Sequence, residues 1–104
     1  MIGAGGKYVE ALKDYAVLLP PFSTAQVEKA LRGLRMAPLL DGVRGDAPMD
    51  IVAFAEVAVS VGRLMMAAGS RIASLDLNPV MVGAVGEGAV VVDALLERGL
   101  KGSR

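Results

Sequence analysis

The sequence predicts an α+β fold in which a mainly antiparallel β-sheet is packed by two helices, in the order β-α-α-β-β. Two segments combine a helical apolar period with capping residues at their starts. Near the C-terminus, two apolar runs joined by glycines are typical of a β-hairpin. We therefore expect a single partial domain over residues 1–104, with a hairpin at its C-terminal end.

The first strand is expected to take most of residues 7–19, a segment of mixed character that Pro20 and Pro21 end. Before it, residues 3–6 read G-A-G-G, which is too compressed for a dinucleotide or P-loop fingerprint. A flexible terminus explains these glycines, and backbone approaching a phosphate is the alternative.

Two helices follow. The first begins at a capping box formed by Ser23 and Gln26 and is expected to fray near Met36. The second runs from a cap at Asp50 to about Ala68, and it is apolar on most of its circumference. A helix of that kind is normally covered on more than one side, which 104 residues cannot fully provide.

A long loop is expected between the helices, over residues 39–48. Arg44 is its one residue that could bind a phosphate in bidentate fashion. Alternatively, Arg44 caps a helix end or pairs with Asp41 or Asp46.

The strand over residues 72–79, I-A-S-L-D-L-N-P, has a polar and an apolar side. Asp76 and Asn78 lie two apart, so a strand places both on one face, and their oxygens are hard ligands of the kind that Mg²⁺ accepts. Asp, Asn and Pro also end ordinary strands in turns, and this alternative stays open.

The predicted hairpin brings a further carboxylate, that of Asp93, beside this strand. If the turn is centred on Val85 and Gly86, Asn78 lies directly opposite Asp93 and both side chains share a face. A slip of one residue would turn Asp93 to the other face. Residues from Glu97 onward are expected to form a frayed tail.

Composition limits the classes of function. The chain is 54% hydrophobic, which favours an exposed apolar face that awaits a partner. No charge-free window reaches about 20 apolar residues and no signal peptide is recognisable, so we expect no membrane span and a cytoplasmic location. Eleven basic residues balance eleven acidic ones without a basic run, which argues against nucleic acid. The absence of Cys and His favours magnesium and phosphate chemistry.

Four segments together carry a family resemblance: G-A-G-G-K-Y-V-E-A-L-K-D, L-L-D-G-V-R-G-D-A-P-M-D, L-D-L-N-P-V and V-V-D-A-L. In this order and spacing they resemble the C-terminal part of the ATP-grasp domain of NDP-forming acyl-CoA synthetases. This group includes ADP-forming acetyl-CoA synthetase and is related to the β-subunit of succinyl-CoA synthetase. The resemblance extends from Gly3 to about Leu96.

The resemblance implies an enzyme lobe. It implies that Asn78 and Asp93 are metal ligands, that Asp76 is a further ligand or supports one, and that Arg44 contacts the phosphates of ATP or ADP. Coenzyme A would bind to domains outside this chain. The lobe that carries the nucleotide-gripping lysine and the CoA-binding domains or subunit would be its partners, and we expect no turnover from this chain alone. The alternative is a non-catalytic interaction module that keeps the fold and forms a homo-oligomer through its apolar helix face.

Overall fold

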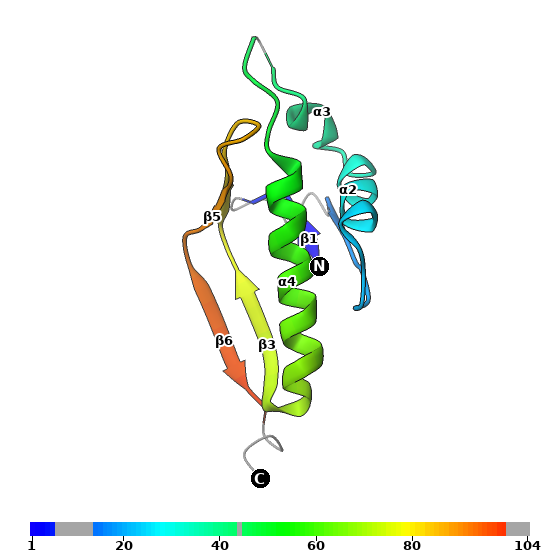
Figure 1. Cartoon of the computed structure of the whole chain (residues 1–104), viewed down its shortest axis with the longest axis vertical. Helices are drawn as coiled ribbons and strands as arrows, with labels where there is room; N and C mark the ends of the chain where they lie inside the picture. Colours follow the sequence, from blue (N-terminus) through cyan, green and yellow to red (C-terminus); the bar gives the residue numbers. More distant parts are fainter. Residues whose placement is uncertain (6–13, 44, 100–104) are drawn as a thin grey trace.

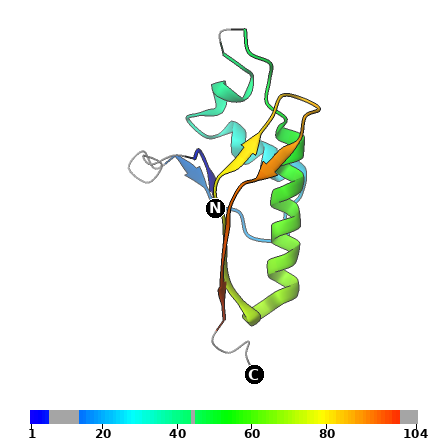
Figure 2. The same cartoon turned by 90° about the vertical axis from the view of Figure 1, so that its left-hand side faces the viewer.

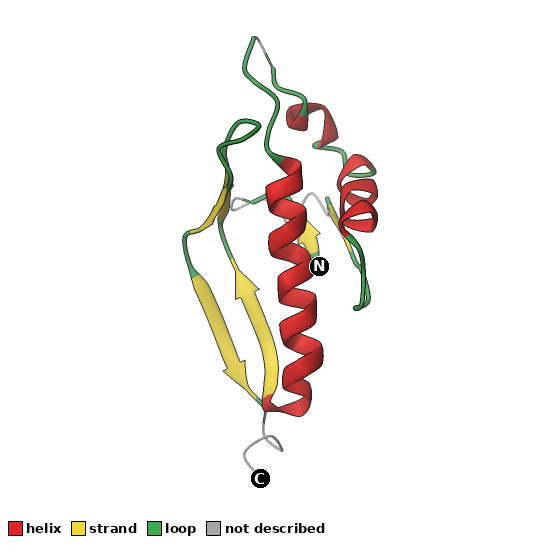
Figure 3. Cartoon of the chain, in the orientation of Figure 1, coloured by secondary structure: helices red, strands yellow, loops and turns green. Residues whose placement is uncertain are grey.

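The chain forms an elongated α+β unit of 53 × 29 × 23 Å. The computed structural model describes residues 1–5, 14–43 and 45–99. The described strands all pair antiparallel, in three two-stranded sheets: β1 with β2, β3 with β6, and β4 with β5 (Figure 3). The predicted fold class is confirmed. The elements are β1 (Ile2–Gly3), β2 (Tyr15–Ala16), α2 (Thr24–Arg32), α3 (Ala37–Leu40), α4 (Ile51–Ala68), a 3-10 helix η1 (Gly69–Arg71), β3 (Ile72–Leu77), β4 (Val80–Val82), β5 (Ala89–Val91) and β6 (Ala94–Arg98).

Helix α4 is the central element of the molecule (Figure 1). The hairpin β3–β4–β5–β6 runs along one side of it, and α2 and α3 lie on the other side (Figure 1). The β1–β2 pair lies near the end of β3, with which β1 lines a cavity (Figure 2). The core lies between α2 and α4, where Val27 is fully buried against a cluster of apolar side chains. Its buried members are Val27, Leu31, Leu34, Leu40, Ala55 and Ala58.

The capping box predicted for α2 is present. Ser23 Oγ accepts a hydrogen bond from Gln26 N at 3.1 Å, and Gln26 Oε1 accepts one from Ser23 N at 2.8 Å. The helix ends at Arg32, and a separate short helix, α3, follows it. The expected loop start at Leu39 was therefore wrong, because Pro38 lies in the first turn of α3, where a missing N–H costs nothing.

The N-terminal glycines also differ from expectation. Ile2 and Gly3 form strand β1 rather than a flexible end, and they pair with Ala16 and Tyr15. Gly3 permits this approach, because a Cβ there would lie 2.7 Å from the Asp14 carbonyl oxygen. Of the strand predicted over residues 7–19, the structure describes only a two-residue strand, and residues 7–13 lie outside the described part.

The hairpin has the predicted register. Val82 pairs with Ala89 near the turn, and Leu77 pairs with Ala94 beyond the middle of the ribbon. Between these pairs, Asn78 N donates to the Asp93 carbonyl oxygen at 3.1 Å. The turn itself is closed by Glu87 N, which donates to the Ala84 carbonyl at 2.8 Å.

The frayed tail expected from Glu97 onward was wrong for its first residues, and residues 100–104 lie outside the described part of the chain. Glu97 and Arg98 belong to β6, where they pair with Ser74 and Ile72. The Glu97 carboxylate accepts a hydrogen bond from Ser74 Oγ at 2.7 Å, and this contact extends the pairing toward the end of β6.

Helix α4 has the predicted bounds, from the cap at Asp50 to Ala68. Much of it is exposed, including Val52, Leu64 and Met66. Segment Ile51–Arg71, with 21 residues and a mean hydropathy of 1.8, could cross a membrane by length and composition alone, although only 17% of it is buried here. This differs from the expectation drawn from charge-free windows. The core helix of a soluble protein can have the same length and composition.

The core between α2 and α4 predicts the effect of truncating Val27. Replacing Val27 with Ala removes two methyl groups from a fully buried site and should lower the free energy of unfolding by about 1–3 kcal/mol. Val52→Ala is the matched control, because that side chain is 54% exposed on α4. Urea denaturation should show a clear loss for Val27→Ala and almost none for Val52→Ala. Equal losses would contradict this location of the core.

Candidate functional site

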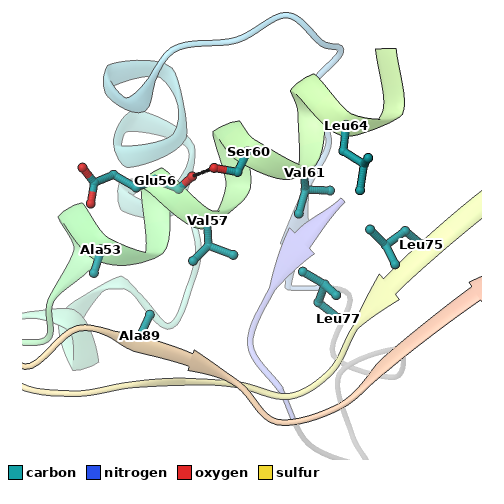
Figure 4. Close-up of a pocket in the computed structure, with 9 residues that line it drawn as sticks. All are labelled: Ala53, Glu56, Val57, Ser60, Val61, Leu64, Leu75, Leu77 and Ala89. Carbon is teal, nitrogen blue, oxygen red and sulfur yellow. Dashed lines mark hydrogen bonds between the residues drawn. The ribbon is translucent and has the colours of Figure 1, made fainter. Parts of the chain in front are cut away.

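The end of β3 positions two polar side chains. Leu75 and Leu77 point toward α4, where they line an open apolar groove with Val57 and Val61 (Figure 4). Because side chains alternate along a strand, Asp76 lies on the opposite face of β3. Asp76 and Asn78 are both exposed. The predicted polar and apolar sides of this strand are therefore present.

Asp76 and Asn78 border a cavity of about 280 Å³ between β1, β3 and α4. Its walls include the apolar side chains of Phe22 and Phe54. The N-terminal residues from Met1 to Gly5 line it as well, so the structure brings the opening glycines beside these two polar residues. The sequence alone did not place them together.

Asp93 lies between β5 and β6, where its backbone carbonyl faces Asn78. It lies opposite Asn78 in the hairpin, its side chain is exposed, and its Oδ1 accepts a hydrogen bond from Ala94 N at 2.8 Å. Asp93 does not line the cavity that Asp76 and Asn78 border. Asn78 is therefore next to both aspartates. Its backbone is hydrogen-bonded to Asp93, and it lines the same cavity as Asp76.

The hairpin changes its inward face at this point. Leu75 and Leu77 face α4 in β3, whereas in β4 the half-buried residues are Val80 and Val82, with exposed Met81 between them. The residues that face inward have odd numbers at the end of β3 and even numbers in β4. Asn78 lies where this alternation changes, between the β3–β6 pairing and the β4–β5 pairing. Side chains at such an interruption are released from ordinary cross-strand packing.

The chemistry of these donors fits a magnesium ion. Two carboxylates and one amide oxygen are hard ligands, and water normally completes the coordination of Mg²⁺. Within the part of the chain that the structure describes, no group of three or more His, Cys, Asp or Glu could hold a metal. A metal here would depend on the mixed set of Asp76, Asn78 and Asp93.

The loop that contains Arg44 is only partly described. Arg44 itself lies outside the described residues. On either side of Arg44, Gly42 and Gly45 both have a φ of 85°. Asp41, one partner considered for Arg44, forms an exposed salt bridge with Arg32 at 2.9 Å.

Sequence reasoning identified Asp50 only as a helix cap. Its Oδ1 does accept a hydrogen bond from Ala53 N at 3.2 Å, but its Oδ2 also accepts from Gly86 N at 3.1 Å and from Gly88 N at 2.9 Å. The hydrogen bonds from Gly88, Ala53 and Gly86 lower the pKa of Asp50, and partial burial opposes them. The sequence signal for this contact is weak, because it consists of an acidic helix cap and a glycine-rich turn more than 30 residues later.

Asp14 is a second polar residue that the sequence did not single out. It is buried, with 8% of its surface exposed. Its two carboxylate oxygens accept hydrogen bonds from Arg35 N at 2.6 Å and Met36 N at 2.9 Å. These bonds attach the start of α3 to the segment that leads into β2, so its role is structural.

Comparisons with known proteins agree on one family. Residues 1–97 match the model of the ATP-grasp domain. A trans-feruloyl-CoA synthase from an unknown prokaryotic organism is 41% identical over 96 residues, which are 92% of this chain and 13% of the relative. The β subunit of ADP-forming acetate–CoA ligase II from Pyrococcus furiosus is 40% identical over 94 residues, which are 90% of this chain and 40% of the subunit.

Solved structures give the same result. A crystal structure of a Pyrococcus horikoshii protein superposes with a TM-score of 0.82 at 35% identity, covering 92% of this chain and 40% of that one. A dinucleotide-forming acetyl-coenzyme A synthetase from Ca. Korarchaeum cryptofilum, in complex with coenzyme A and Mg-AMPPCP, has a TM-score of 0.82 at 33% identity, covering 92% and 44%. The chain spans less than half the length of each of these proteins.

The hydrogen bonds of Asp50 predict a pH-dependent stability. Because its folded-state pKa lies below the ordinary value of 3.8, its ionised form stabilises the fold above that pH. The contribution should disappear as the pH falls from 3.8 through the lower folded-state pKa. Thermal unfolding from pH 7 to pH 2 should therefore show Asp50→Asn converging on the unmodified chain at acid pH.

The control for this titration is Asp41→Asn, which changes an exposed aspartate in a surface salt bridge. Its unfolding temperature should stay close to that of the unmodified chain throughout. A deficit of Asp50→Asn that stayed constant from pH 7 to pH 2 would contradict the role of the carboxylate.

Proposed function

The chain belongs to the ATP-grasp domain family, and on that premise we propose that it is the metal- and nucleotide-phosphate-binding lobe of an NDP-forming acyl-CoA synthetase. Such a ligase couples the conversion of ATP to ADP and phosphate to the joining of an acid and coenzyme A as acyl-CoA. The observation that carries the proposal is the backbone pairing of Asn78 with Asp93, together with the cavity that Asn78 lines with Asp76, Gly3 and Gly5.

Each residue has a distinct part in this proposal. Asn78 and Asp93 would hold Mg²⁺ through the amide oxygen and the carboxylate, and Asp76 would add a ligand or orient one. When bound, the metal supplies charge neutralisation for the phosphates. Gly5 would let a phosphate approach the backbone, since a Cβ there would meet nothing within 4 Å. Arg44 would contribute a phosphate contact from its loop.

The remaining parts of the enzyme would come from elsewhere. The related synthetase with Mg-AMPPCP and coenzyme A is more than twice as long as the matched segment. We propose that the other ATP-grasp lobe and the CoA-binding domains or subunit lie outside this chain. We propose a cytoplasmic enzyme without nucleic-acid or membrane partners, and the isolated chain would not turn over substrate.

Removing one ligand should weaken nucleotide binding that depends on the metal. In the enzyme that carries this lobe, Asp93→Ala should raise the dissociation constant of Mg-ATP by about 10- to 100-fold, as the loss of ligand support does in other metal sites. Calorimetric titration measures it. Glu97→Ala is the matched control, because it removes a carboxylate from β6, the strand that follows Asp93, without touching the ligand set. Equal affinity and equal turnover in the Asp93 variant and the parent would overturn the assignment.

An interaction module that forms a homodimer is the alternative function. The exposed Val52, Leu64 and Met66 on α4 favour some protein partner. Sedimentation of the isolated chain separates the two ideas. A tight dimer that dissociates on Leu64→Asp would support the module, whereas our proposal expects a monomer that binds the other lobe.

A further inference from the structure

The turn of the hairpin is attached to the start of α4 by several hydrogen bonds. Asp50 Oδ2 accepts from Gly86 N at 3.1 Å and from Gly88 N at 2.9 Å. In the opposite direction, Asp50 N donates to the Gly83 carbonyl oxygen at 2.8 Å. Val85 N also donates to the Pro48 carbonyl at 3.0 Å. The turn is therefore held on both of its sides by one short segment.

The strands themselves specify their register weakly. On one side of the turn the chain reads A-V-V-V over residues 89–92, and its three valines are all exposed, so burial does not distinguish one of them from the next. On the facing strand, Val80, Met81 and Val82 are all apolar as well. Register is well specified only where one face differs from the other in polarity, and this pattern does not provide that difference.

The turn is also permissive by itself. Gly86 and Gly88 both adopt positive φ, near 88° and 87°, and Gly83 begins the same turn. A turn with so many glycines can close in more than one place. The Asp50 carboxylate accepts hydrogen bonds from two N–H groups of this turn, those of Gly86 and Gly88, which adds a constraint that the local sequence lacks.

We propose that Asp50 is a positioning residue: its carboxylate fixes the hairpin register in which Asn78 lies opposite Asp93. The metal-binding consequence rests on the function proposed above, whereas the effect on register does not. A slip of one residue would leave apolar burial nearly unchanged and would carry Asp93 to the other face of the ribbon. Asp50, the cap of α4, would thereby determine whether Asn78 and Asp93 face each other in the hairpin.

Asp50→Asn separates the two roles of this side chain. Asn caps helices about as well as Asp, so the bond to Ala53 N and the helix start should persist. An amide has one acceptor oxygen, and its NH₂ group cannot accept from Gly86 N and Gly88 N. The variant should therefore fold while losing the selective hold on the turn.

Cross-linking reads the register directly, because the chain contains no cysteine. The pair Met81→Cys with Val90→Cys reports the observed register, since these two residues face each other and are 59% and 63% exposed. The pair Met81→Cys with Val91→Cys reports a slip of one residue. In the full chain, Asp50→Asn should lower the ratio of observed to slipped cross-linking by at least about fivefold, the factor for one of the two hydrogen bonds that are lost. Asp41→Asn should leave it unchanged.

Titration with magnesium chloride, followed by the amide resonance of Asn78, completes the experiment. Asp50→Asn should raise the half-saturating Mg²⁺ concentration by a similar factor of about five. An unchanged cross-linking ratio would overturn the positioning role, whatever the magnesium result. A shifted ratio with unchanged magnesium binding would support the positioning role and overturn the metal site, so the two ideas are tested separately.

Discussion

A single carboxylate joins the two halves of this structure. Asp50 caps α4 through Ala53 N and holds Gly86 N and Gly88 N of the hairpin turn. Helix α4 carries the core on one side and the hairpin on the other (Figure 1), so this contact relates the core to the ribbon. Three backbone donors on one carboxylate also explain why its pKa is lowered.

The hairpin shows how a local contact reaches a distant pair of residues. Apart from Ala89, every residue of β5 and β6 is exposed, so burial against α4 does not decide which residues of these two strands face β3 and β4. Asn78 and Asp93 lie where the inward face changes, several residues from the turn. Their juxtaposition is a property of register, and register is decided at the turn.

Much of this arrangement could be predicted from the sequence. The capping box at Ser23, the bounds of α4 and the pairing of Asn78 with Asp93 follow from local patterns, because caps, periods and turn lengths act over few residues. Contacts between distant segments could not be predicted. The burial of Asp14 under Arg35 N and the approach of the opening glycines to the cavity depend on tertiary packing. The metal assignment itself stays a prediction, and Arg44 lies outside the described residues.

We propose that the hairpin register places Asn78 and Asp93 together as ligands of one metal ion. Nuclear Overhauser effects between backbone protons of Asn78 and Asp93, recorded with and without Mg²⁺, would test this placement. We predict these contacts in the metal-free chain and a joint shift of both amide resonances with one half-saturating concentration. Contacts from Asn78 to the position of Val92 or Ala94 in place of Asp93, or a shift of only one of the two residues, would contradict the account.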